Sequence, residues 1–329
     1  MLETFFAALT PILTLFICIA AGFTVRKANI VDRSAGKTLS KLVLWIFCPA
    51  LNFSVMAKNC TTQTLSTHAI NVILGCCAVV ISILIAIVLS RLFVRKKSPE
   101  RGIYAYALAF ANSGYMGDPL ILMLLGEQAF AFYKLFTLPI TFAIYSWGLL
   151  QLAPRGTERG NFLKNLLNFP MIATTLGAVF GLSGLGGHLP EFINQSLDTL
   201  KVCMGPGAML VAGFTIANYP FKKMLTKPKV YAASFLRLTL IPAAVIGAVF
   251  VIKELTNLTL GLEINNNVLY LLFFAVATPL GLNTVVFPEA YGGDAEIGAG
   301  MTMISHIMCV PLMPLMYALM TLIFGPAAF

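Results

Sequence analysis

The stretch Phe110-Ala-Asn-Ser-Gly-Tyr-Met-Gly-Asp-Pro-Leu120 lies inside an apolar segment long enough to cross a lipid bilayer, yet it does not favour a continuous helix. Gly114 and Gly117 carry no side chain that would hold the backbone at helical angles. Pro119 lacks an N–H group, and in a regular helix its ring collides with the carbonyl group four residues earlier. In hydrocarbon, an interrupted helix is tolerated only where protein buries it or where it lines a watery cavity. The stretch therefore predicts a broken membrane helix with a functional role.

A second stretch of this kind lies near the other end of the chain. It reads Ala277-Thr-Pro-Leu-Gly-Leu-Asn-Thr284, in which Pro279 and Gly281 are the helix-breaking residues. Two interrupted segments at corresponding positions of two halves indicate the binding site of a secondary transporter. We therefore expect a transporter whose site lies at the two breaks.

The composition is that of an integral membrane protein. Of the 329 residues, 58% are hydrophobic and 11% are charged, and the mean hydropathy is +0.86, whereas soluble domains carry about 25% charged residues. The net charge of +9 does not indicate nucleic acid as a partner, because the basic residues cluster in short loops, as expected of a surface that faces anionic lipid. The seven cysteines include no C-x-x-C pair, so we expect packing residues rather than metal sites, and no cofactor.

The sequence contains ten segments that approach the length of about 20 apolar residues that a membrane span needs. They are 2–24, 38–57, 68–92, 102–125, 128–152, 168–187, 191–218, 230–252, 266–289 and 297–324. The first of them lacks the basic start of a signal peptide, and we expect it to be retained. The predicted domains are a first five-helix repeat at 1–152, a charged cytoplasmic linker at 153–168 and a second repeat at 169–329.

Basic residues predict the orientation in the cell membrane. Most of them follow odd-numbered spans, whereas the loops after even-numbered spans hold only Lys58 and Lys253. The positive-inside rule then places the odd loops in the cytoplasm and both termini on the opposite side. Because each half has five spans, the second half must be inverted relative to the first, which is a recurrent plan of secondary transporters. Phe47-Cys-Pro-Ala-Leu-Asn52 and Met204-Gly-Pro-Gly-Ala-Met209 are echoes that support this repeat.

A set of motifs runs through the whole chain. The motifs are Ala21-Gly-Phe-Thr-Val-Arg-Lys27, Leu39-Ser-Lys-Leu-Val-Leu44, Cys48-Pro-Ala-Leu51, Asn112-Ser-Gly-Tyr-Met-Gly-Asp-Pro-Leu120, Pro206-Gly-Ala-Met-Leu-Val-Ala-Gly-Phe-Thr215, Thr278-Pro-Leu-Gly-Leu-Asn283 and Tyr291-Gly-Gly-Asp294. In order and spacing they resemble the auxin efflux carrier family. Without the long cytoplasmic loop of many plant members, the chain is similar to the compact prokaryotic members, the malate and malonate permeases.

The resemblance implies an all-α fold of ten membrane helices in which helices four and nine cross at their broken centres, as in bile-acid symporters and sodium/proton antiporters. It implies a scaffold of helices 1, 2, 6 and 7, and a transport unit of helices 3–5 and 8–10 that moves like an elevator. Family substrates are small organic carboxylates such as malate, malonate or auxin, and related folds form homodimers. The chain departs from the family pattern at Asp118, where many members have an apolar or small residue.

The candidate substrate-binding residues are polar residues within the predicted spans. Asn112 lies about 10 residues into its span, or roughly 15 Å at 1.5 Å per residue, and its neutral amide can donate to a carboxylate without the desolvation cost of a full charge. The N-terminal end of the half-helix that follows the break adds a partial positive charge. The full set is Asn112, Ser113, Asn283, Thr284, Thr278, Asn52, Lys201 and His306. For each of them, a purely structural contact is the alternative; for Lys201 that alternative is a pair with Asp198.

Asp118 is the least expected residue, because a carboxylate this deep in a membrane is costly unless it is paired or protonated. Two kinds of role stay open. Asp118 is either a coupling residue that carries H+ or binds Na+, or a structural residue that caps the helix break or pairs with a basic side chain. Lys134 and Arg237 are further ionisable residues inside predicted spans.

Other protein classes fit the sequence less well. An intramembrane aspartyl protease needs Gly-x-Gly-Asp and a second apposed Asp, but the spacing from Gly114 to Asp118 is one residue too long, so we do not expect an enzyme. An anion channel or a non-transporting membrane sensor on the same fold is the alternative to a transporter. The inverted halves and the two broken helices favour alternating access over a continuous pore.

Overall fold

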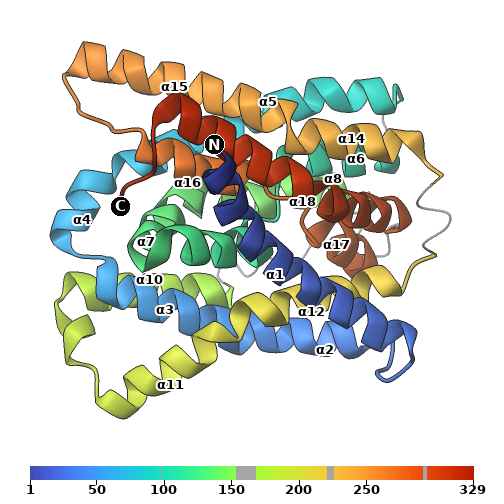
Figure 1. Cartoon of the computed structure of the whole chain (residues 1–329), viewed down its shortest axis with the longest axis horizontal. Coiled ribbons are helices and arrows are strands. Elements are labelled where there is room, and N and C mark those ends of the chain that lie inside the picture. Colours follow the sequence, from blue (N-terminus) through green and yellow to red (C-terminus); the bar gives the residue numbers. More distant parts are fainter. Residues whose placement is uncertain (97, 153–167, 221–225, 292–294) are drawn as a thin grey trace.

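The computed structural model describes residues 1–96, 98–152, 168–220, 226–291 and 295–329 (Figure 1), and every regular element within them is helical. The elements are α1 (Leu2–Lys27), α2 (Ala35–Leu42), η1 (Val43–Phe47), α3 (Cys48–Asn59), α4 (Thr62–His68), α5 (Ile70–Phe93), α6 (Pro99–Ala109), η2 (Ser113–Gly117), α7 (Asp118–Ala143), η3 (Ile144–Gly148), α8 (Leu149–Leu152), α10 (Phe169–Leu182), η4 (Leu185–His188), α11 (Glu191–Val202), α12 (Met204–Ala217), α14 (Pro228–Leu238), α15 (Leu240–Leu260), α16 (Asn267–Val276), α17 (Asn283–Tyr291) and α18 (Glu296–Phe324). Residues 153–167 of the predicted linker at 153–168, and the motif residues 292–294, lie outside the described residues.

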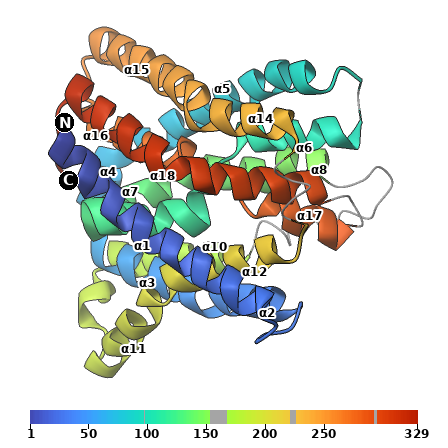
Figure 2. The same cartoon turned by 45° about the vertical axis from the view of Figure 1, so that its right-hand side comes forward.

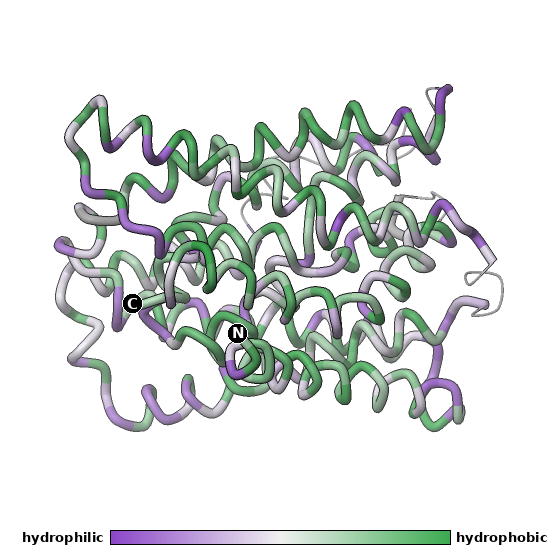
Figure 3. Tube along the Cα trace, turned by 45° about the horizontal axis from the view of Figure 1, so that its top comes forward, coloured by the Kyte–Doolittle hydropathy of each residue, from purple (hydrophilic) through white to green (hydrophobic). Residues whose placement is uncertain are grey.

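Long apolar helices make this a multi-pass membrane protein. Within the described residues, seven helical segments are long and apolar enough to cross a bilayer, and two shorter apolar helices accompany them. Figure 3 shows hydrophilic residues gathered mainly toward the ends of the molecule, with hydrophobic stretches between them. Figure 2 shows both termini on the left side of the molecule, whereas the loop that joins α1 to α2 lies to the right, at the other end of α1. The division into ten spans stays a prediction.

Two predicted span boundaries can be compared directly with the structure. The boundary between the fourth and fifth spans coincides with a kink at Gly126, whose φ of +85° is a conformation that favours glycine. The predicted end of the eighth span at residue 252 lies inside a longer helix, because α15 continues to Leu260. Its charged Lys253 is accommodated there by an ion pair with Glu254 at 2.7 Å and a hydrogen bond to Oδ1 of Asn266 at 2.8 Å.

The helices form two groups, which we call the first and the second group. The first consists of α1, α2, η1, α3, α10, α11 and α12, which pack mainly on one another; the second consists of α5, α6, α7, α14, α15, α16 and α18. In Figures 1 and 2 most of the first group lies in the lower part of the molecule and most of the second in the upper part. The groups meet where α1 packs against α18 and where α3 packs against α7.

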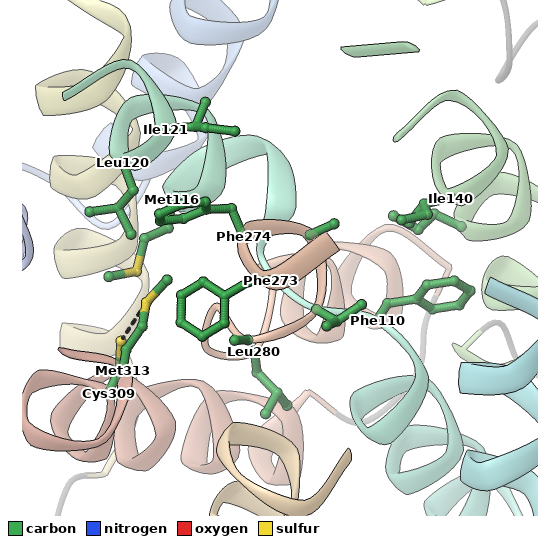
Figure 4. Packing of buried hydrophobic residues seen from close by; sticks show 14 of the residues in the cluster. Phe110, Met116, Leu120, Ile121, Ile140, Phe273, Phe274, Leu280, Cys309 and Met313 are labelled. Carbon is green, nitrogen blue, oxygen red and sulfur yellow. Dashed lines mark hydrogen bonds between the residues drawn. The ribbon is translucent and has the colours of Figure 1, made fainter. Parts of the chain in front are cut away.

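Both predicted breaks are present in the structure, and they meet. Helix α6 ends at Ala109 and helix α16 ends at Val276. Between α6 and η2, and between α16 and α17, Ala111 and Leu280 form an isolated antiparallel bridge. Figure 4 shows Leu280 with the buried side chains of Phe273 and other apolar residues around this crossover.

The residues predicted to break the first helix act differently from that expectation. Gly114 and Gly117 belong to η2, a π-helical turn, and Pro119 lies in the first turn of α7. The π-helical turn runs directly into α7, and its N–H groups bond five residues back instead of four, so these residues distort the helix there without ending it. The interruption therefore precedes them, at 110–112, whereas Pro279 and Gly281 do lie within the second interruption, at 277–282.

Candidate substrate cavity at the helix crossover

A cavity of about 220 Å³ lies beside the crossover, and both groups of helices line it. The first group contributes polar residues of α2 and α3, such as Ser40 and Asn52, together with the start of α10. The opposite wall is built from the two breaks, the middle of α7, η3 and α17. The lining residues used below are Ser40, Cys48, Asn52, Asn112, Ser113, Gly114, Tyr115, Asp118, Lys134, Thr137, Thr141, Tyr145, Asn168, Gly281, Asn283 and Phe287.

The two asparagines of the crossover present amide groups on the same cavity. The main-chain N–H of Asn112 donates to the carbonyl oxygen of Pro279 at 2.8 Å, while its side-chain Nδ2 is buried without a hydrogen-bond partner. Nδ2 of Asn283 donates to the hydroxyl of Tyr106 at 3.1 Å, which fixes the orientation of that amide. A buried donor without a partner is costly, so Nδ2 of Asn112 is suited to an acceptor atom of a ligand.

Asn52 faces the cavity from the first group of helices. Its Nδ2 donates to the carbonyl oxygen of Pro170 at 3.3 Å and contacts Sγ of Cys48 at 3.7 Å. Its Oδ1 is buried and has no partner. The cavity wall therefore offers an unused acceptor on Asn52 and an unused donor on Asn112, so it can hold a ligand that has both kinds of polar atom.

An ion pair is built into the cavity wall. Nζ of Lys134 lies 2.5 Å from Oδ2 of Asp118, and it also lies 4.9 Å from the ring centre of Phe130. Both residues belong to α7 on opposite sides of the kink at Gly126, so the pair joins the two limbs of this helix. The Lys134 side chain is 13% exposed and that of Asp118 is 1% exposed. Asp118 and Lys134 are the only residues with a formal charge at neutral pH among the described residues that line the cavity.

Tyrosines hold the crossover and connect the two groups. The hydroxyl of Tyr133 donates to the carbonyl oxygen of Ser113 at 2.9 Å and approaches that of Phe274 at 3.5 Å, so it links both broken helices. The hydroxyl of Tyr115 lies 3.3 Å from that of Ser40, which belongs to the other group of helices. The first contact supports the site from behind, and the second closes the cavity across the group boundary.

Comparison with known proteins identifies the family. The membrane transport protein family, which comprises the auxin efflux carriers, matches residues 7–161 and 159–317. The chain belongs to this family. A relative from Methanocaldococcus jannaschii, named an uncharacterized transporter, is 24% identical over 292 residues, or 87% of this chain and 90% of that protein. A protein of Rhizobium meliloti named "Putative malonate transporter" is 25% identical over 207 residues, or 60% of this chain and 63% of that protein.

This membership makes the chain a membrane transporter, as the motifs indicated. Half of the predicted substrate-binding residues line the cavity beside the crossover. Those that line it are Asn112, Ser113, Asn283 and Asn52, and the predicted coupling residue Asp118 lies there as well. Thr284 instead donates to the carbonyl oxygen of Gly281 at 2.8 Å and shares a hydrogen bond with Thr302, behind the crossover. Thr278 is fully buried and is not among the lining residues.

The two ionisable residues in the predicted set lie elsewhere in this transporter. Lys201 is in ion pairs with Glu127 and Asp198, each at 2.7 Å, and does not line the cavity. His306 lines a separate apolar groove of about 190 Å³ between α1, α12 and α18, where its Nδ1 lies 2.7 Å from the carbonyl oxygen of Thr302. Both positions were selected by depth alone, and depth does not tell which face of a helix a residue occupies.

Several cavity residues were not in the predicted set. They are Ser40, Tyr115, Lys134, Thr137, Thr141, Tyr145 and Asn168. The sequence indicated a functional position for Lys134, because it is a charged residue inside a predicted span. It contained no such indication for Asn168, which caps the start of α10 by accepting a hydrogen bond from the N–H of Met171.

Proposed function

We propose that this transporter is a secondary carrier of small organic carboxylates and that it binds them in the crossover cavity. Nδ2 of Asn112 carries the proposal, because it is a buried donor without a partner in the cavity wall. A carboxylate oxygen would satisfy this donor and remove the cost of leaving it unpaired. Asn112 provides this donor without placing a second formal charge in the membrane interior.

Further features of the cavity favour an anion of small size. The helical segments that begin at Ser113 and Asn283 start at the cavity, and helix N-termini carry partial positive charge. Lys134 adds an ammonium group to the wall, where it is paired with Asp118. The volume of about 220 Å³ lies below the roughly 300–1,000 Å³ typical of pockets for drug-sized ligands. The name of the Rhizobium meliloti relative supports malonate as a first probe, and malate or an auxin-like acid are the other carboxylates we propose.

We further propose elevator-type alternating access between the two groups of helices. The cavity lies between the groups and takes residues from both, so a sliding movement of one against the other would carry the crossover past Ser40 and Asn52. In this proposal the first group is the scaffold, the second is the transport unit, and the ten helices form two inverted repeats at 1–152 and 169–329. We also propose that the carrier is a homodimer.

An anion channel or a non-transporting sensor is the second candidate, because a polar cavity in a membrane protein also suits a pore. Uptake of labelled malonate and malate into proteoliposomes, with pH and sodium gradients imposed separately, discriminates the candidates. Saturable uptake supports a carrier, whereas flux that rises in proportion to solute concentration supports a channel. If saturable uptake of carboxylates is unchanged in both Asn112→Ala and Asn283→Ala, the assignment of the site is wrong.

A further inference from the structure

The charged residues that line the cavity have no net positive charge to balance a bound anion. Lys134 and Asp118 cancel each other, and no other described lining residue has a formal charge at neutral pH. Helices α12 and α16, which also pack near η2 and α7, contain no Asp, Glu, Lys, Arg or His. A bound carboxylate would therefore leave a net negative charge in the interior of a membrane protein, where unpaired charge is costly.

The ion pair is arranged so that the lysine can change its partner. An ammonium group has three N–H donors on a flexible stem, and Nζ of Lys134 uses one contact on Asp118 and lies against the ring of Phe130. Lys134 is also the more exposed member of the pair, and it lines the same cavity as Nδ2 of Asn112. A carboxylate held by Asn112 is thus within the cavity that Lys134 faces.

Asp118 has no other partner that would keep it charged. Its Oδ2 is bound to Lys134, and its Oδ1 is buried without a hydrogen bond. The other titratable groups that face the pair are Cys48 of α3, Tyr133 of α7, and two cavity tyrosines, Tyr115 and Tyr145. Thiols and phenols are neutral at pH 7 at their ordinary pKa values, so none of them replaces the positive charge of Lys134.

We propose that Lys134 binds the substrate carboxylate and that Asp118 takes up one proton from cavity water as it loses this contact. The proposal rests on the proposed carboxylate transport and names its coupling. Before binding, the site holds Lys-NH3+ and Asp-COO−; one singly charged carboxylate and one proton enter, and the site then holds Lys-NH3+ paired with the substrate and neutral Asp-COOH. For a monoanion, or for a dicarboxylate that enters with its second carboxyl group protonated, the net charge is zero before and after, so the loaded carrier crosses the membrane without an uncompensated charge.

The arrangement favours a proton over sodium as the accompanying ion. A sodium ion at Asp118 would lie close to the ammonium group of Lys134 and be repelled by it. A proton needs only a single carboxylate oxygen, and Oδ1 of Asp118 is buried without a hydrogen-bond partner.

Calorimetry on the purified full chain tests the proposal. Malonate, malate and acetate are titrated in two buffers of different ionisation enthalpy, with sodium or choline as the cation, which gives the number of protons taken up per anion. For each acid, we expect the wild type to take up about one proton per anion more than Asp118→Asn does, and for the singly charged acetate we expect about one proton and none, respectively. Lys134→Gln should weaken binding by about tenfold or more, as expected for a lost charge-assisted hydrogen bond. Lys58→Gln and Asp198→Asn, whose charges lie off the cavity, are the matched controls and should behave as the wild type.

Each outcome decides the question. Because Lys134→Gln leaves a buried carboxylate unpaired and can impair folding, the double variant Asp118→Asn with Lys134→Gln removes both charges; we expect it to be folded, to bind weakly and to take up no proton. Binding without proton uptake, or uptake of sodium instead, overturns this inference and leaves carboxylate transport standing. If none of the acids binds the wild type, both the proposed function and this inference are overturned.

Discussion

The main-chain N–H of Asn112 donates a hydrogen bond to the carbonyl oxygen of Pro279 over 2.8 Å. This contact joins two breaks that are far apart in the sequence, and it satisfies the Asn112 backbone without using the side chain. In a continuous helix the same N–H would bond four residues back along its own chain. Breaking both helices at this point therefore pairs the backbone of one break with the other and leaves the Asn112 amide available to the cavity.

Replacement of Asn112 by Ala should weaken binding more than it weakens the fold. Since Nδ2 of Asn112 has no partner in the protein, its removal breaks no side-chain hydrogen bond by that atom. A lost hydrogen bond to a charged ligand corresponds to about 1.5–3 kcal/mol, or roughly a 10- to 150-fold change in affinity. Binding of malonate by the purified protein, with thermal unfolding measured in parallel, checks this expectation. Asn59→Ala, at the end of α3 and away from the cavity, is the control. Equal affinities of the two variants for malonate would contradict a role of Asn112 in binding.

Replacement of Ser305 by Ala should destabilise the crossover. Oγ of Ser305 accepts from the N–H of Leu280 at 3.0 Å, and both groups are buried. An unsatisfied buried donor costs about 1–3 kcal/mol, so we expect a lower unfolding temperature and weaker transport. Thermal unfolding of Ser305→Ala against Ser183→Ala, whose hydroxyl is exposed, measures the effect. If the two variants unfold at the same temperature, Ser305 does not support the crossover.

The sequence predicted the existence of the breaks but not the contacts made through them. Pro279, Gly281 and the polar residues near Asn112 are unfavourable in a lipid-exposed helix, and this local signal is independent of the rest of the fold. The partner of Asp118 could not be derived in the same way. Lys134 reaches it only because the chain turns at Gly126, where a positive φ brings the two limbs of α7 together. Lys201 and His306 have equally suitable depths, and only the packing of α11 and α18 shows that they face away from the cavity.

The packing of α1 on α12 should depend on glycine at position 22. A Cβ atom there would lie 2.7 Å from the carbonyl oxygen of Leu210, which is backbone and cannot rotate away. We expect Gly22→Ala to lower stability by about 1–3 kcal/mol, as for other overpacked interiors. Gly247→Ala in α15 is the matched control, because nothing lies within 4 Å of its Cβ position, and alanine favours a helix by up to about 1 kcal/mol. Thermal unfolding of both variants checks this contrast, which a stabilised Gly22→Ala would refute.

An ion pair crosses the boundary between the two groups of helices. Nζ of Lys201 in α11, which belongs to the first group, lies 2.7 Å from Oε1 of Glu127 in α7, which belongs to the second. Sliding of one group along the other would break this pair in every transport cycle. The Glu127 side chain is 39% exposed, and exposed pairs are worth about 0–1 kcal/mol. Glu127→Gln should therefore change the transport rate by up to about fivefold while leaving carboxylate affinity unchanged, because neither residue lines the cavity.

The measurement compares the initial rate of malonate uptake with its equilibrium affinity in Glu127→Gln and in Lys58→Gln. Lys58 makes a similar ion pair, with Asp198 at 3.3 Å, but both residues of that pair lie in the first group. If the groups slide, only Glu127→Gln alters the rate, and raising the salt concentration in the wild type should alter it in the same direction by screening the pair. Equal rates in the two variants would mean that the pair is not broken during transport, and a change in affinity would mean that Glu127 acts on the cavity itself.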